Sequence, residues 1–287
     1  MPRILFFSGR EFAIIVAVGI ATGLIDDKIE MLQFVSVARI HALVLLNDYL
    51  AFRTGGPIFG DLLEMWLEFG GVLAACLVRK PAAGTIALTI NGFCQVFAYG
   101  THDPHLLYGL PGLGADIVFA FFRYRRYDLP AVCLAGIASA MFWYPVVWFT
   151  HGLYLYPPSF ILSDLLFRVV GSTVGNGLFA FALVLVILTL ARRKGIAPSA
   201  DPFGVGKDAM KKAIPIASLA ILVSVVIVAL TYALPSVSNF FLSIGPKIPS
   251  GILRMEEYNP GYVIGIVITF LVLTVLAFGR LKSRISA

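Results

Sequence analysis

The chain has 287 residues, of which 59% are hydrophobic and 13% are charged, whereas a soluble domain has about 45–50% apolar and about 25% charged residues. This composition excludes a single water-soluble core, and no long polar stretch is left for a soluble catalytic domain. The net charge of +6 does not indicate nucleic-acid binding, because the basic residues lie where they would orient a membrane protein.

Apolar runs long enough to cross a bilayer recur along the chain, and they lack the alternating pattern of a β-barrel. In lipid the backbone must satisfy its own hydrogen bonds, so these runs are expected to be helices. They cover about 11–25, 59–78, 82–99, 106–122, 129–150, 160–191, 214–235 and 261–279. The sequence therefore predicts an all-α, polytopic membrane helix bundle with a six-helix core and two additional C-terminal transmembrane helices.

Two segments do not fit the simple pattern of spans. Residues 29–57 are apolar but interrupted by charged residues, and we interpret them as an amphipathic or re-entrant outer segment, with a ninth span as the alternative. Residues 196–213 form a polar, Pro- and Gly-containing linker that we expect to be cytoplasmic. The predicted organisation is thus a membrane domain over 1–195, the linker, and a helix pair over 214–287.

The basic residues predict the orientation of the chain. Most of the 22 Lys and Arg residues lie near the N-terminus or in clusters at 79–80, 123–126, 192–194, 207–212 and 280–284. With the N-terminus inside, all these clusters fall on the inner side of the bilayer. We therefore expect a multi-pass protein of the cytoplasmic membrane with both termini in the cytoplasm.

Charged side chains inside the spans are the first candidates for function, because a charge there costs at least about 2.5–3.5 kcal/mol on insertion scales. Asp116 follows a glycine-rich stretch and is a candidate binding residue, the alternative being a hydrogen bond to a neighbouring helix. Glu68, close to Trp66, is expected to face the bundle interior. Arg168 lies one helical turn after Asp164, and these two predict a structural ion pair rather than a ligand contact.

A polar and aromatic stripe runs along the third span. Asn91 and Gln95 are four residues apart and share one helix face, and Tyr99 continues it outward. These residues are candidates for substrate binding, with interhelical hydrogen bonding as the alternative. Trp143 in the fifth span lies deeper than an interfacial aromatic belt requires, and it would suit stacking on a flat heteroaromatic ligand.

Small residues on the first span predict a helix contact. Ala13, Ala17 and Ala21 recur every four residues, with Gly19 and Gly23 beside them. Such spacing lets two helices approach closely. The sequence leaves open whether the partner is another helix of this chain or another protein.

No signature of an enzyme, a cofactor site or a metal centre was found. The HExxH, GxSxG and P-loop motifs are absent, so the chain is not expected to hydrolyse ATP, and active transport would need a partner or an ion gradient. His102 and His105 flank Asp103 in an outer loop, which is weak evidence for a metal site. The three cysteines are interpreted as free thiols.

Several short motifs together resemble the YkoE-type S components of energy-coupling factor (ECF) transporters. The likeness runs from about 61 to 193 and keeps the order and spacing of the motifs. The motifs are Arg79-Lys80-Pro81, Gly112-Leu113-Gly114-Ala115-Asp116, Phe122-Arg123-Tyr124, Leu129-Pro130, Leu134-Ala135-Gly136 and Arg168.

This resemblance implies a capture subunit for thiamine or its hydroxymethylpyrimidine precursor. It also implies a transmembrane coupling protein and two cytoplasmic ATPases as partners, and it assigns the alanine stripe of the first helix to the coupling protein. Gln95 and Asp116 stand where the family has Glu, and Pro111 replaces a Gln. Loss of the carboxylate at Gln95 favours a related small heterocycle over thiamine itself, and Glu68 is a candidate to supply the missing charge.

Two other functions are compatible with the same residues. A stand-alone, ion-coupled transporter would use Glu68, Asp116 and Arg168 as a proton relay. An intramembrane enzyme acting on lipids would use His102, Asp103 and His105. The preferred prediction is a non-enzymatic, cofactor-free capture subunit that binds a small heteroaromatic vitamin or precursor in the lipid bilayer.

Overall fold

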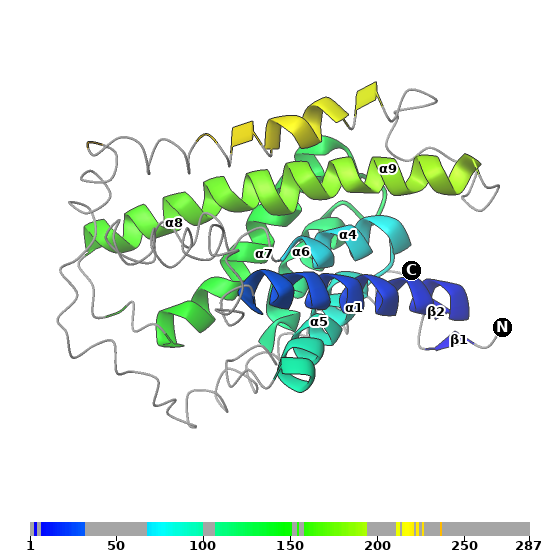
Figure 1. Cartoon of the computed structure of the whole chain (residues 1–287), viewed down its shortest axis with the longest axis horizontal. Helices are drawn as coiled ribbons and strands as arrows, with labels where there is room; N and C mark the ends of the chain where they lie inside the picture. Colours follow the sequence, from blue (N-terminus) through cyan, green and yellow to red (C-terminus); the bar gives the residue numbers. More distant parts are fainter. Residues whose placement is uncertain are drawn as a thin grey trace.

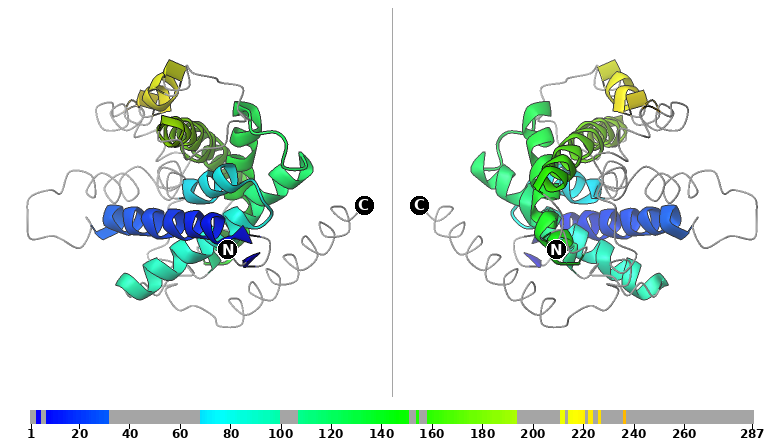
Figure 2. Two further views of the ribbon diagram at one scale, coloured as in Figure 1. Left: turned by 90° about the vertical axis from the view of Figure 1, so that its right-hand side faces the viewer. Right: turned by 90° about the vertical axis from the view of Figure 1, so that its left-hand side faces the viewer.

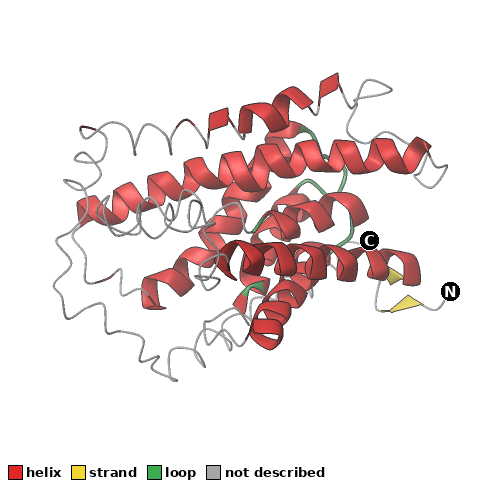
Figure 3. Cartoon of the chain, viewed as in Figure 1, coloured by secondary structure: helices red, strands yellow, loops and turns green. Residues whose placement is uncertain are grey.

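The computed structural model is helical throughout nearly all of the part that it describes (Figure 3). It describes residues 3–4, 7–31, 68–99, 107–150, 154 and 158–193, together with parts of 211–236. Two short strands, β1 (Arg3–Ile4) and β2 (Phe7–Ser8), pair antiparallel ahead of the first helix. The helices are α1 (Gly9–Met31), α4 (Phe69–Val78), α5 (Ala83–Tyr99), α6 (Gly109–Phe121), α7 (Leu129–Thr150), α8 (Pro158–Ser172), the π-helix η3 (Thr173–Phe179) and α9 (Ala180–Arg193).

The predicted spans of the core correspond to these helices, with differences at their ends. The first helix is longer than expected, because α1 continues beyond 25 to Met31. The predicted sixth span, 160–191, is α8, η3 and α9 in immediate succession. Of the predicted second span, only α4 and the residue before it lie in the described part.

Local hydrogen bonds explain where two of the helices begin. Ser8 and Glu11 form a capping box at the start of α1: the Ser8 backbone N–H donates to Glu11 Oε2 at 2.7 Å, and the Glu11 N–H donates to Ser8 Oγ at 3.3 Å. At the start of α7, Asp128 Oδ1 accepts a bond from the Ala131 N–H at 3.1 Å. These hydrogen bonds fix the first residues of α1 and α7.

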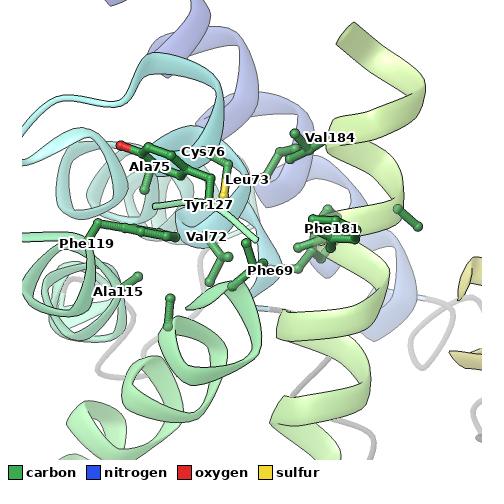
Figure 4. Close-up of a cluster of buried hydrophobic side chains, with 14 of the residues drawn as sticks. Phe69, Val72, Leu73, Ala75, Cys76, Ala115, Phe119, Tyr127, Phe181 and Val184 are labelled. Carbon is green, nitrogen blue, oxygen red and sulfur yellow. The ribbon is translucent and has the colours of Figure 1, made fainter. Parts of the chain in front are cut away.

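Helix α4 lies at the centre of the bundle. It packs against α1, α5, α6 and α9, and every residue from Phe69 to Val78 except Leu77 is buried. Figure 4 shows its side chains between Phe119 and Tyr127 on one side and Phe181 and Val184 of α9 on the other.

Glycines allow the three central helices to come close together. A Cβ at Gly71 of α4 would lie 2.7 Å from a methyl group of Leu88, and one at Gly84 of α5 would lie 2.9 Å from the Gly71 carbonyl oxygen. A Cβ at Gly112 of α6 would collide with the Gly84 carbonyl. Hydrogen at these positions is therefore what permits the contact, as in other closely packed membrane helices.

The basic ends of several helices meet at one end of the bundle. Lys80, in the turn between α4 and α5, forms a 2.7 Å ion pair with Glu11 at the start of α1. In the same turn, the Arg79 guanidinium lies 5.7 Å from the ring centroid of Tyr127, in the connection between α6 and α7. The start of α1, the 79–80 turn and the connection between α6 and α7, three of the segments that the sequence assigned to one side of the membrane, are thus neighbours in space.

Two helical stretches of the described part are long and apolar enough to cross a membrane: 129–146 and 164–191. Two shorter helices, α4 and α6, are apolar throughout most of their length. Large apolar side chains are exposed along α6 and α8, including Phe121, Leu162 and Leu166. Such surfaces are typical of lipid-facing helices.

Part of the predicted seventh span packs on the core. Residues 214–220 are helical and lie beside α9 (yellow in Figures 1 and 2). Ile216 and Ala217 contact the central apolar cluster, and Ala220 is fully buried. The eighth span, nearly all of the linker and the outer segment beyond residue 31 lie outside the described residues.

Candidate functional site

Asp116 holds the beginning of α5. Its Oδ2 accepts bonds from the Thr85 backbone N–H at 2.8 Å and from the Thr85 hydroxyl at 2.7 Å, and its Oδ1 accepts one from the Gly84 N–H at 3.2 Å. The carboxylate is 2% exposed, and the N-terminus of a helix stabilises a negative group. This geometry matches the alternative interpretation of Asp116, in which it hydrogen-bonds to a neighbouring helix.

The connection between α6 and α7 contacts the part of α6 that carries Asp116. The Tyr124 hydroxyl donates to the Asp116 backbone oxygen at 3.1 Å, and the rings of Phe119 and Tyr127 stack with centroids 4.9 Å apart. Burial raises the pKa of both Tyr124 and Tyr127 well above the ordinary value. Both phenols are therefore neutral at physiological pH, and Tyr124 can serve as a hydrogen-bond donor.

Asn91 and Gln95 form a polar chain between α5 and α1. Gln95 Nε2 donates to Asn91 Oδ1 at 2.6 Å, Asn91 Nδ2 donates to Thr22 Oγ1 at 3.1 Å, and the Thr22 hydroxyl donates to the Val18 carbonyl at 2.9 Å. Gly70 of α4 lies directly against Thr22. All three polar side chains are buried, so sequence reasoning correctly paired Asn91 with Gln95 but did not find Thr22.

Glu68 is joined to a residue that sequence reasoning missed. Asn176, in the π-helix η3, donates from Nδ2 to Glu68 Oε2 at 3.2 Å, and both residues are buried. Asn176 Oδ1 is buried without a hydrogen-bond partner among the described residues. A signal was available, because Asn176 is the one side-chain amide in the apolar run 160–191 and has glycines on both sides.

Glu68 and Gly70 lie on different faces of α4. Residues two apart on a helix lie on nearly opposite sides, and Gly70 faces Thr22 while Glu68 faces Asn176. Gly70, next to the Thr22–Asn91–Gln95 chain, and Glu68, bonded to Asn176, therefore lie on different faces of α4. Asp116 lies apart from Gln95, since its partners at 84–85 precede Gln95 by about 15 Å along α5.

Aromatic and charged groups gather on the second half of α7. Trp143 packs edge-to-face on Tyr108 with ring centroids 5.0 Å apart. Arg168 Nε lies 3.3 Å from Asp164 Oδ2, and both side chains are at most 1% exposed. The Arg168 guanidinium also lies 5.6 Å from the centroid of the Tyr144 ring. The structure thus contains the ion pair that the sequence suggested.

The small residues of α1 divide into two faces. Ala13, Ala17 and Ala21 are exposed. Gly19 and Gly23 are buried against α5, where a Cβ at Gly19 would lie 2.5 Å from the Ala87 carbonyl oxygen. Packing within the described bundle is therefore carried by the glycines, and it leaves the alanine face uncovered.

Some predicted residues lie outside the described part. They are Trp66, His102, Asp103, His105 and the side chain of Tyr99. Among the described residues no group of three His, Cys, Asp or Glu side chains could hold a metal ion.

Comparison with known proteins places this fold. A solved crystal structure of an S-component of an ECF transporter superposes with a TM-score of 0.56 at 22% sequence identity, covering 74% of this chain and 98% of the other. A family model described as the permease component of an ABC-type cobalt transport system matches residues 10–142. A protein of Bacillus subtilis (strain 168) named as an HMP/thiamine permease protein, YkoE, is 30% identical over 131 residues.

These findings define a membrane protein with the S-component fold. The match to the Bacillus subtilis protein spans 45% of this chain and 65% of the relative, so less than two thirds of that relative's length is covered. Sequence and fold agree, and the resemblance to the YkoE type of ECF S component is confirmed.

Proposed function

We propose that this chain is the substrate-binding membrane subunit of an ECF-type ABC importer that captures a small heteroaromatic vitamin or precursor of the thiamine and hydroxymethylpyrimidine class. The observation that carries this proposal is the buried Glu68–Asn176 pair inside an S-component fold. A carboxylate inside a membrane bundle is costly and is usually functional. The name of the Bacillus subtilis relative supports the substrate class.

The chemistry of the pair favours a ligand that donates hydrogen bonds. An ionised Glu68 can only accept, so Asn176 must turn its NH₂ group toward it and its Oδ1 away. That oxygen is buried, and a buried acceptor without a partner costs about 1–3 kcal/mol. An amino group on a heterocycle would satisfy Asn176 Oδ1 beside the negative charge of Glu68.

The other predicted binding residues differ in whether they would contact the ligand in this proposal. Trp143, with Trp66 and Tyr99, would stack on the ring of the ligand. Gln95 and Asn91, whose side chains bond to one another and to Thr22, would contact the ligand through their remaining hydrogen-bonding atoms. Asp116 is left out of the ligand site, because three hydrogen bonds commit its carboxylate to the start of α5.

The exposed alanine face of α1 is proposed to bind the transmembrane coupling protein. Its three alanines leave a shallow helix surface, and close helix contacts in membranes use such surfaces. Two cytoplasmic ATPases would complete the importer, since the sequence has no P-loop of its own. The proposed location is the cytoplasmic membrane with both termini inside, which the clustering of basic turns supports.

Ligand binding to the purified full-length chain tests the proposal. Isothermal titration with thiamine, hydroxymethylpyrimidine and a wider vitamin panel should identify at least one ligand with a Kd below about 1 μM, equivalent to about 8 kcal/mol of binding free energy. Co²⁺ belongs in the panel because the matching family model concerns cobalt transport. Failure of every vitamin to bind, with and without coupling subunits, would remove the capture function.

The role of the central pair is tested by Glu68→Gln. This variant removes the charge but keeps the shape, and a charge-assisted bond exceeds a neutral one by about 1 kcal/mol or more. Affinity should therefore fall by about fivefold or more. Asp128→Asn, which removes a carboxylate that is 43% exposed, is the matched control and should bind as the native chain does.

A stand-alone, ion-coupled transporter is the second candidate, favoured by the buried carboxylate of Glu68. A continuous relay through Glu68, Asp116 and Arg168 is not supported, because Asp116 bonds to α5 and Arg168 pairs with Asp164. Uptake in cells that lack every coupling ATPase would favour this candidate over the importer.

A further inference from the structure

The connection between α6 and α7 has an unusual backbone conformation. Arg123 and Tyr124 both have a φ of 54°, a left-handed backbone that favours glycine and that residues with side chains adopt at a cost. Backbone bonds fix the turn: the Arg123 N–H donates to the Ala120 oxygen at 2.8 Å, and the Tyr124 N–H donates to the Phe119 oxygen at 2.8 Å. Such strain persists only where the surrounding structure enforces it, and it is often associated with function.

This turn presents two arginines outward. Arg126 is partly neutralised, because its Nε lies 2.6 Å from Asp128 Oδ2. Arg123 and Arg125 are exposed, and neither forms an ion pair within the described part of the chain. The turn therefore displays two positive charges, and Asp128, the carboxylate that follows them in the sequence, is bound to Arg126.

An exposed apolar surface on α6 lies next to the arginines of the turn. Ile117 and Phe121 are four residues apart on α6 and are 38% and 81% exposed, so they form one outward stripe. The Phe121 ring packs edge-to-face on Phe122 at 5.4 Å, and the Arg126 guanidinium lies 5.3 Å from the Phe122 ring centroid. In a membrane protein, an exposed apolar stripe faces acyl chains, and the charged residues where it ends lie at headgroup depth.

We infer that the turn between α6 and α7 is a binding site for the headgroup of an anionic phospholipid. Arg123 and Arg125 would contact the phosphate, and Phe121 with Ile117 would pack along an acyl chain. Guanidinium groups suit phosphate oxygens in both charge and geometry. The lipid is favoured over an acidic protein segment because the apolar stripe that leads into the arginines matches the amphiphilic shape of a lipid.

The inference is tested on the full-length protein in nanodiscs made of phosphatidylcholine with or without phosphatidylglycerol. Phosphatidylglycerol should raise the unfolding temperature of the native chain by about 4–8 °C, the shift expected from two arginines at a membrane surface. The double variant Arg123→Gln/Arg125→Gln should lose this shift. Arg123→Lys/Arg125→Lys should retain most of it, which shows that the effect depends on charge and not on a damaged turn.

A control of equal charge is Lys211→Gln/Lys212→Gln, which removes two exposed basic residues elsewhere and should keep more of the shift than the arginine-to-glutamine variant does. The site is overturned if phosphatidylglycerol shifts the native chain and the arginine-to-glutamine variant equally, or shifts neither. It is also overturned if the arginine variant keeps the lipid effect but no longer assembles with coupling subunits, since the turn would then bind a protein.

Discussion

At the scale of single residues, the hydrogen bonds of Asp116 predict that this residue stabilises the fold. Asp116→Asn keeps one oxygen but turns an NH₂ group toward the donors of Gly84 or Thr85. Each unsatisfied buried group costs about 1–3 kcal/mol, so the unfolding temperature should drop by several degrees. Ligand affinity of the folded fraction should stay the same. A selective loss of affinity would instead show that Asp116 is part of the binding site.

Thr85→Val provides the partner variant for a double-mutant cycle. It removes the hydroxyl that donates to Asp116 Oδ2 at 2.7 Å while nearly preserving the side-chain shape. The two changes should be less than additive when combined, because they remove one shared interaction. Simple addition of the two stability losses would show that Asp116 stabilises α5 by some other route.

Sequence reasoning succeeded for residues whose partners are near in the chain and failed for those whose partners are distant. Arg168 and Asp164 are one turn apart, so helical spacing alone brought them together. Asn176 and Glu68 are 108 positions apart, and no periodicity indicates such a contact. For Asp116 the sequence identified an important residue but could not decide between ligand binding and a helix contact, because both need a buried polar group.

At the scale of elements, α1 offers a matched pair of substitutions on its two faces. Gly19→Ala would place a Cβ 2.5 Å from the Ala87 carbonyl oxygen, and overpacking of this kind costs about 1–3 kcal/mol. Ala17→Leu changes an exposed position and should leave the unfolding temperature within about 2 °C of the native value, since surface changes cost less than about 0.5 kcal/mol.

The effects of these two substitutions on assembly with the coupling protein should be the reverse of their effects on stability. Ala17→Leu should reduce the amount of coupling protein that copurifies with the chain, because a larger side chain prevents close helix contact. Folded Gly19→Ala should retain it. If Ala17→Leu copurifies with the coupling protein as the native chain does, the alanine face of α1 is not the docking surface.

Hydropathy located the helices of the core because lipid permits few other structures. It did not reveal that the sixth span contains a π-helical segment between α8 and α9. A π-helix changes the direction of side chains without interrupting an apolar run, and such segments are frequent at functional sites. Here the π-helix carries Asn176, the residue that donates to Glu68.

At the scale of the whole molecule, contacts between distant segments support the predicted grouping of loops. Lys80 pairs with Glu11, and Arg79 lies over Tyr127, so the start of α1 and two basic turns share one end of the bundle. Basic charge predicts that this end faces the cytoplasm. Tyr154 lies between α7 and α8, a helix length away from the basic turns, and is 43% exposed.

Cysteine labelling in intact cells tests this orientation. In a variant without the three native cysteines, Tyr154→Cys should react with a membrane-impermeant maleimide added outside, because its end of the bundle would face the exterior. Arg125→Cys, in the exposed basic turn, should react only after the cells are lysed. The reverse pattern would place the basic turns outside, and it would separate them from ATPases in the cytoplasm. Labelling of both positions only after lysis would show that the end bearing Tyr154 is covered, and a detergent-solubilised sample would then distinguish burial from sidedness.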